Sequence, residues 1–221
     1  MAMDFFKQLF NPVAPSSLVE SAFADVSGML QQSSEMLEHA LRALLDNQPL
    51  SLDLEGMDDM VDDAERRVRR AILQHLAVNP HQDLVASLVL VSMVQDAERI
   101  GDFARGLVEL MKMARSPRTG PFADELRDLA ARVHPLFPVT ERAFRNGDLP
   151  DARQVVRDYA ALRGALKDYR ARVATSELSP DMAIVYAGAA QILRRVGAHL
   201  ANIASTVIQP YDRIRHLDED G

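Results

Sequence analysis

The chain has 221 residues, 48% of them hydrophobic, which is enough to bury a sizeable core in one large domain or two small ones. With 32 acidic and 25 basic residues its net charge is −7, so the basic surface of a nucleic-acid-binding protein is not expected. It contains no cysteine, which excludes disulfides and thiolate metal sites and restricts any metal ion to oxygen or imidazole ligands.

Residues 1–15 are predicted to form a short amphipathic leader, with large apolar side chains at Phe5, Phe6, Leu9 and Phe10. The leader lacks the sustained apolar stretch and the cleavage site of a signal peptide. The longest apolar run in the chain, about eleven residues, is too short to span a bilayer. We therefore expect a cytoplasmic protein without a membrane span, whose leader packs on its own domain or on a dimer partner. Weak contact with a transporter or membrane surface is the alternative.

Residues 16–116 are predicted to form a first three-helix bundle. Ser17 and Glu20 have the spacing of a capping box, which starts a helix that reaches about residue 46. A second helix is expected over 52–78 and a third over 82–114, because their apolar residues recur with helical spacing and Pro/Asn pairs separate them. The proline- and glycine-containing segment 116–121 then indicates a linker between domains.

Residues 121–210 are predicted to form a second three-helix bundle, with helices over 122–145, 151–175 and 181–208. Pro135 and Pro138 must kink or split the first of these, because proline removes a backbone donor and clashes with the preceding turn. No alternating strand pattern is present. The sequence therefore predicts an all-α fold of two tandem three-helix bundles, followed by a polar tail at 211–221.

A weak internal repeat supports this division into halves. Residues 95–102 (QDAERIGD) align with residues 191–198 (QILRRVGA), with identical Gln, Arg and Gly at matching positions in the last helix of each half. A glycine inside a helix costs about 1 kcal/mol relative to alanine, so Gly101 and Gly197 are expected at close contacts between helices.

Glu98 and Asp102 stand out because they continue the apolar stripe of the predicted third helix. At about 100° per residue, each lies roughly 20° from the line of Val91, on opposite sides of it. A carboxylate that points toward a core must be paired, hydrated or bound to a cation, because an isolated buried charge is very costly. The pair is therefore a candidate metal site.

The second helix carries a further acidic group, in which Asp58, Asp62 and Glu65 share one side. Two adjacent helices with such pairs would present several oxygen ligands to one groove, and these suit Fe, Mn, Zn, Mg or Ca. The alternative is a solvated acidic face neutralised by the arginines that follow it, at positions 66, 67, 69 and 70.

These motifs resemble those of the PhoU family of phosphate-uptake regulators. The matching segments are Glu98-Arg-Ile-Gly-Asp102, Asp58-Asp-Met-Val-Asp62 and residues 194–204 (RRVGAHLANIA). The resemblance implies two repeated three-helix bundles, each marked by (Glu/Asp)-x-x-x-Asp motifs that can hold iron or zinc clusters. It also places His199 at a histidine position of the family pattern, where packing is expected over metal coordination.

The second half departs from the family pattern. Arg194 and Ala198 stand where the pattern has Glu and Asp, and the obvious acids of the preceding helix are Asp158 and Asp168, with Leu162 four residues after Asp158. A cationic side chain in place of a ligand would repel a metal ion. We therefore predict that only the first bundle binds metal, through Asp58, Asp62, Glu98 and Asp102, with Glu65 as an additional ligand.

The resemblance implies a non-enzymatic regulator or accessory protein of phosphate transport or signalling, which docks a phosphate transporter component, a sensor histidine kinase, or both. A homodimer is also open. Two alternatives remain: a metal-dependent carboxylate-bundle enzyme, which would need a general base that the sequence does not identify, and a purely structural helical dimerisation module whose acids pair with arginines.

Overall fold

The computed structural model describes residues 17–80 and 84–209, and these residues are helical with short connections and no strand. The predicted leader (residues 1–15) and polar tail (211–221) lie outside the described residues. The helices are α2 (Ser17–Leu45), α3 (Leu54–Val78), α4 (Leu84–Met113), α5 (Pro121–Ala131), α6 (Leu136–Asn146), α7 (Leu149–Ala174) and α8 (Pro180–Ile208). The predicted all-α class is confirmed.

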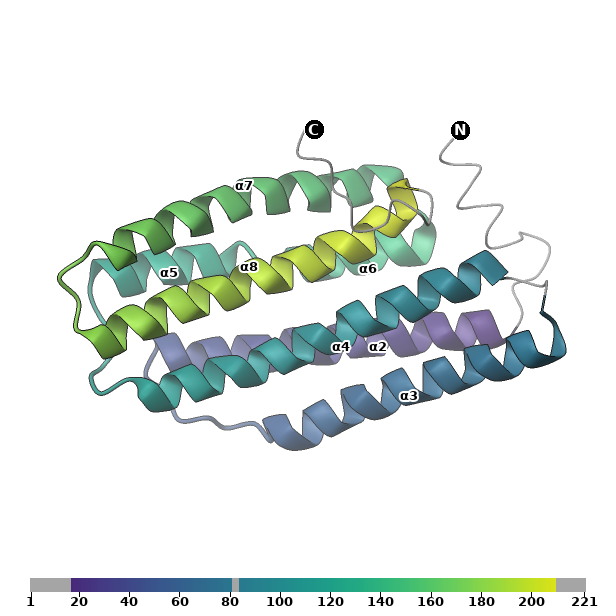
Figure 1. Cartoon of the computed structure of the whole chain (residues 1–221), viewed down its shortest axis with the longest axis horizontal. Helices are drawn as coiled ribbons and strands as arrows, with labels where there is room; N and C mark the ends of the chain where they lie inside the picture. The colour runs from purple at the N-terminus through teal and green to yellow at the C-terminus, as the bar shows by residue number, and fades with distance from the viewer. Residues whose placement is uncertain (1–16, 81–83, 210–221) are drawn as a thin grey trace.

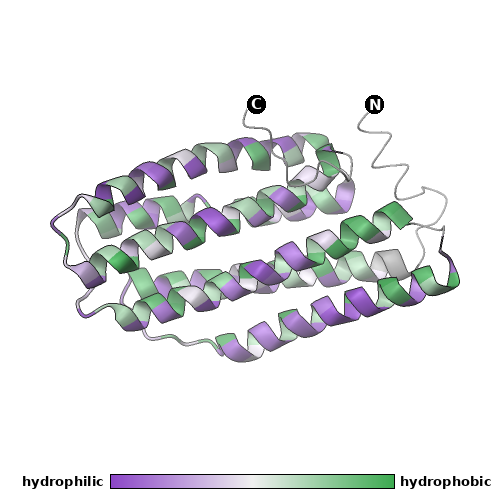
Figure 2. Ribbon diagram, in the orientation of Figure 1, coloured by the Kyte–Doolittle hydropathy of each residue, from purple (hydrophilic) through white to green (hydrophobic). Residues whose placement is uncertain are grey.

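Helices α2, α3 and α4 form the first bundle, in which neighbours along the chain run antiparallel (Figure 1). Asp53 starts α3 as its N-cap, because its side chain accepts a hydrogen bond from the Gly56 amide at 3.0 Å. Val61, Val68 and Ile72 recur at helical spacing on α3 and are buried against α2 and α4. Along most of its length the opposite side of α3 is hydrophilic (Figure 2).

Helices α5 to α8 form the second bundle. The predicted helix over 122–145 is split as expected, because α5 ends at Ala131 and α6 begins at Leu136, directly after Pro135. Gly147 ends α6 in the left-handed conformation (φ 63°), which glycine adopts without steric cost. Helices α7 and α8 then pack along each other over most of their length (Figure 1).

Helices α4 and α8 hold the two bundles together. They pack against each other in the middle of the molecule, and the apolar core continues from one bundle into the other. Ile100 and Leu107 of α4 and Leu193 and Leu200 of α8 belong to this one buried cluster. Burial of such side chains stabilises each by about 1.5–3 kcal/mol relative to exposure, so the bundles stabilise each other.

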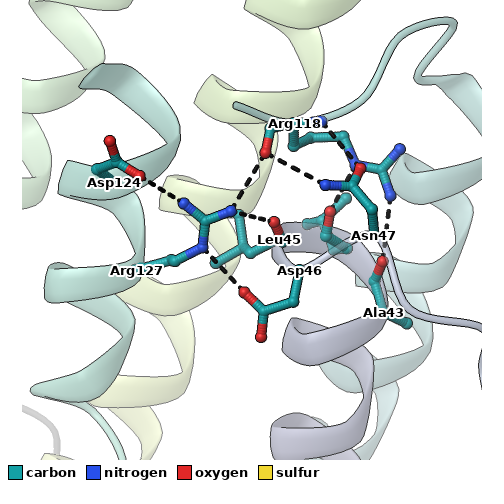
Figure 3. Close-up of polar contacts among 8 residues, drawn as sticks. Ala43, Leu45, Asp46, Asn47, Arg118, Asp124 and Arg127 are labelled. Atoms are coloured by element: carbon teal, nitrogen blue, oxygen red, sulfur yellow. Dashed lines mark hydrogen bonds and ion pairs between the residues drawn. The ribbon is translucent and has the colours of Figure 1, made fainter. Parts of the chain in front are cut away.

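Two arginines tie the end of α2 to the second bundle (Figure 3). Arg118, in the linker, donates to the backbone carbonyls of Ala43 (3.1 Å) and Leu44 (2.5 Å). Arg127 of α5 donates to the carbonyl of Leu45 at 2.5 Å. These carbonyls lack partners within the helix, and a cation is favoured at a helix C-terminus. The linker is thus fixed by capping α2.

Candidate metal-binding face

The packing of α4 on α3 brings the two acidic motifs together. Gly101 of α4 faces α3, and a Cβ added to it would lie 3.5 Å from Oδ1 of Asp58 and 3.7 Å from Val61. These are ordinary contact distances, so the two helices meet without excluding a larger residue at this position. The acidic face comprises Asp58, Asp62 and Glu65 of α3 and Glu98 and Asp102 of α4.

Glu98 is a partly buried member of the acidic face. Its side chain is only 17% exposed, and burial is the largest cause that raises its pKa to about 7. Asp102 on the same helix raises it further, and Glu65 and Asp62 act in the same direction from α3. The acids of α3 and α4 are therefore near enough for their charges to oppose the ionisation of Glu98.

Asp58 is the most buried of the five acids, with 6% of its surface exposed. Burial raises its pKa, and the guanidinium of Arg105, whose Nη1 lies 2.5 Å from Asp58 Oδ2, acts in the opposite direction. Asp102 and Asp62 add repulsion. Asp58 therefore depends on Arg105 of α4 for its counter-charge.

Arginines at the edge of the face pair with its other carboxylates. The ion pairs are Arg66–Asp62 (3.3 Å), Arg69–Glu65 (2.7 Å), Arg99–Asp102 (3.0 Å) and Arg99–Glu98 (3.5 Å). The arginine side chains are 44% to 62% exposed, and exposed pairs contribute about 0–1 kcal/mol each. The arginines can therefore leave their carboxylates at small cost.

Among residues 17–80 and 84–209, no three carboxylates or imidazoles lie together in an arrangement that could hold a metal ion. The donor set nevertheless suits hard cations, because it consists of carboxylate oxygens on two packed helices. A bound ion would require these side chains to turn from their arginines toward one another. The assignment of ligands to Asp58, Asp62, Glu65, Glu98 and Asp102 stays a prediction.

The second bundle has a different arrangement at the corresponding crossing of α8 and α7. A Cβ added to Gly197 would lie 2.8 Å from the ring of Tyr159 and 3.8 Å from Leu162. Gly101 contacts two residues of α3 that are three positions apart, Asp58 and Val61. Gly197 contacts two residues of α7 with the same separation, Tyr159 and Leu162, so Tyr159 is the structural counterpart of Asp58.

Tyr159 was missed in the sequence, which directed attention to the neighbouring Asp158. Asp158 is exposed, whereas Tyr159 is 6% exposed; burial raises the pKa of its hydroxyl, and the charge of Arg194 acts in the opposite direction. The available signal was the apolar spacing of Val155, Tyr159 and Leu162, which marks the buried side of α7.

Asp96 and His199 form a polar contact between the bundles that sequence reasoning also missed. Asp96 of α4 is 3% exposed, and its Oδ1 lies 2.7 Å from Nδ1 of His199 of α8 and 3.5 Å from Nδ2 of Asn202. The ring of Phe103 packs 5.5 Å from the imidazole. His199 thus connects the two bundles away from the acidic face. The presence of an acid inside an apolar helical run was the signal for Asp96.

Within the described part of the chain, no helix combines the length and the apolar character needed to cross a bilayer.

Comparison with known proteins links this helical architecture to one family. Residues 26–111, which cover the first bundle with its acidic face, match the model of the PhoU domain. A phosphate-specific transport system accessory protein, PhoU homolog 1 of Thermotoga maritima, is 27% identical over 193 residues, or 84% of this chain and 83% of that protein. PhoU homolog 2 of the same organism is 34% identical over 87 residues, or 39% of this chain and 37% of that protein.

Solved structures extend the similarity to the whole fold. The crystal structure of PhoU from Pseudomonas aeruginosa superposes with a TM-score of 0.75 at 25% identity, over 87% of this chain and 96% of that one. The phosphate transport system regulatory protein PhoU from Streptococcus pneumoniae superposes with a TM-score of 0.69 at 17% identity, over 86% and 93% of the two chains. The latter similarity concerns the fold alone.

Proposed function

We propose that this chain, whose residues 26–111 match the PhoU domain, is a member of the PhoU family and a non-enzymatic accessory or regulatory protein of phosphate transport. The observation that carries the proposal is the similarity to a phosphate-transport accessory protein over 84% of the chain. The acidic face supports a role in docking and not in phosphate binding, because carboxylates repel an anion. We propose a phosphate transporter component or a sensor histidine kinase as the docking partner.

We also propose that the acidic face holds a metal ion through Asp58, Asp62, Glu98 and Asp102, with Glu65 in addition. Iron, zinc, manganese, magnesium and calcium all accept carboxylate ligands. When bound, the ion would supply positive charge that offsets the repulsion among the acids and links α3 to α4. Because the pKa of Glu98 is about 7, a cation competes there with a weakly held proton near neutral pH.

The metal proposal is tested with the double variant Glu98→Gln/Asp102→Asn, which removes two carboxylate charges while preserving side-chain size. We expect it to lose the metal that co-purifies with the wild type, as measured by elemental analysis. It should also lose any rise in melting temperature on adding metal, because an ion at 100 times its Kd stabilises the folded state by about 2.7 kcal/mol.

The matched control is Asp158→Asn/Asp168→Asn, which removes two exposed carboxylates from α7. It should retain wild-type metal content. Equal metal content in all three proteins would contradict the ligand assignment without affecting the proposed role in transport.

The role in transport is tested in cells that lack this chain. We expect altered uptake of labelled phosphate, restored by the wild-type gene, and co-purification of the tagged chain with a phosphate transporter component or a sensor histidine kinase. Unchanged uptake together with the absence of both partners would overturn the proposal.

A further inference from the structure

The hairpin of α3 and α4 ends in a concentration of exposed apolar side chains. Eight large apolar residues are strongly exposed in the described residues, and five of them lie here. This apolar tip consists of Leu73 (70% exposed), Val78 (77%), Leu84 (43%), Val85 (37%) and Leu88 (37%). Figure 2 shows the end of α3 and the start of α4 as hydrophobic. Such a concentration marks a surface that something covers.

The chain itself supplies a suitable apolar segment, which precedes a helix that begins at the same end of the molecule as the apolar tip. α2 begins beside the end of α3 and the start of α4 (Figure 1). The ion pair between Asp25 and Arg67 (3.4 Å) joins the early part of α2 to the middle of the antiparallel α3, which fixes this alignment. The leader, residues 1–15, precedes α2 directly and carries four large apolar side chains, Phe5, Phe6, Leu9 and Phe10.

The connection is long enough for the leader to reach the apolar tip. The chain makes seven Cα-to-Cα steps from Phe10 to Ser17, and an extended chain covers about 3.5 Å per step, or about 25 Å in all. Packed helix axes are only about 8–10 Å apart, so this length can cross the end of the bundle. Pro12 and Pro15 disfavour a continuous helix from the leader into α2, which permits a change of direction.

We propose that the leader docks on the apolar tip of its own chain, with its phenylalanines covering the exposed residues of α3 and α4. The occupant is intramolecular because the chain joins leader and tip, so their effective concentration is high and does not depend on protein concentration. This inference is independent of metal binding and of the role in phosphate transport.

The first test uses Phe6→Trp in the full chain, which contains no other tryptophan. We expect blue-shifted emission and severalfold weaker quenching by acrylamide than for a free tryptophan, both unchanged on dilution. Adding Leu84→Asp and Leu88→Asp should restore the emission of an exposed indole. The matched control is Ile184→Asp, which charges an exposed apolar residue (55% exposed) near the start of α8 and should leave the emission buried.

Three results would overturn the proposal: exposed-indole emission in Phe6→Trp alone, loss of the blue shift on dilution, or equal release by Ile184→Asp. Loss on dilution would instead assign the tip to a second copy of the chain.

The second test uses the absence of cysteine in the natural chain. Phe6→Cys combined with Leu84→Cys should form a disulfide within one chain under mild oxidation. Phe6→Cys combined with Met113→Cys is the control, because Met113 is also exposed (55%) but ends the 30-residue α4 about 45 Å from the tip. The chain from position 6 to Ser17 spans at most about 38 Å when fully extended. Cross-links only between chains, or equal yields for the two pairs, would contradict intramolecular docking.

Discussion

The two bundles share one type of helix crossing but place different side chains at it. Gly101 and Gly197 occupy matching places in α4 and α8, but Gly101 faces the carboxylate of Asp58 whereas Gly197 faces the ring of Tyr159. The difference continues along the repeat, where Glu98 corresponds to Arg194 and Asp102 to Ala198. In the second bundle Arg194 donates to Gln191 at 3.1 Å, and its charge lowers the pKa of Tyr159 against the larger effect of burial.

This comparison shows how one helical scaffold can keep or lose a charged site. The first bundle retains acids that repel one another and need counter-ions, which is a cost to its stability. The second bundle fills the same position with the buried aromatic ring of Tyr159. We infer that this crossing contributes only packing in the second bundle, whereas in the first bundle it carries the candidate metal ligands. The following predictions test this division, starting with the largest expected effect.

The alignment of the two halves pairs His199 of α8 with Phe103 of α4. The variant His199→Phe therefore gives α8 the residue that α4 has at this position. It removes the imidazole partner of the buried Asp96 carboxylate, to which Asn202 still donates, and the loss of one partner of a buried polar group costs about 1–3 kcal/mol. We expect that loss in the free energy of unfolding, measured by urea denaturation. His134→Phe, which changes an exposed histidine, is the control and should alter it by less than about 0.5 kcal/mol. Similar effects of the two variants would contradict a structural role for the contact between the bundles.

Gly197→Ala and Gly101→Ala should have opposite effects. At Gly197 the new methyl group would lie 2.8 Å from the buried ring of Tyr159, so the packing must shift at a cost of about 1–3 kcal/mol. At Gly101 the nearest atom is 3.5 Å away, and alanine should be neutral or stabilise the helix by up to about 1 kcal/mol. Thermal unfolding of the two metal-free variants measures both. Equal destabilisation would show that the two crossings are equally tight.

The sequence allowed the fold to be predicted because each helix carries its own signals. Apolar spacing, the Pro135 break and the capping residues are local, so they need no knowledge of distant contacts. Spacing on adjacent helices also predicted that Glu98 and the acids of α3 lie on one side of the bundle, whereas their convergence on a metal ion stays a prediction. Asp96 with His199, and Tyr159 with Arg194, were not predictable in this way, because each pairing depends on how two helices are rotated about their axes. An apolar stripe fixes such a rotation only coarsely.

Glu98 gives the acidic face a pH dependence near neutral pH. Its pKa is raised from 4.5 to about 7, mainly by burial, so the folded state holds this proton more tightly than the unfolded state. The resulting stabilisation is fully present below pH 4.5 and is lost as pH rises through about 7. For a partly exposed group we expect a difference of about 2 kcal/mol after allowance for solvent screening.

Glu98→Gln should remove this contribution to the pH dependence of the metal-free protein. It should be more stable than the wild type at pH 8 and similar to it at pH 4.5, as measured by chemical denaturation at both values. Asp158→Asn on α7, an exposed carboxylate, should leave the wild-type pH profile unchanged. A wild-type profile in Glu98→Gln would show that Glu98 is solvated like an ordinary surface acid.

Arg99→Ala should have the smallest effect on stability and the most specific effect on the acidic face. Arg99 lies 3.0 Å from Asp102 and 3.5 Å from Glu98 but is 48% exposed, so its removal should cost less than about 0.5 kcal/mol. Because its charge lowers the pKa of Glu98, that pKa should rise further in the variant.

A metal ion that competes with the guanidinium of Arg99 for both carboxylates should bind more tightly to the variant above pH 8, where Glu98 is ionised in either protein. Calorimetric titration measures this affinity, with Arg145→Ala as the control, because it removes an exposed pair of similar kind with Glu141 (3.2 Å) in the second bundle. Weaker metal binding in Arg99→Ala than in the control would mean that the arginine organises the carboxylates and does not compete for them.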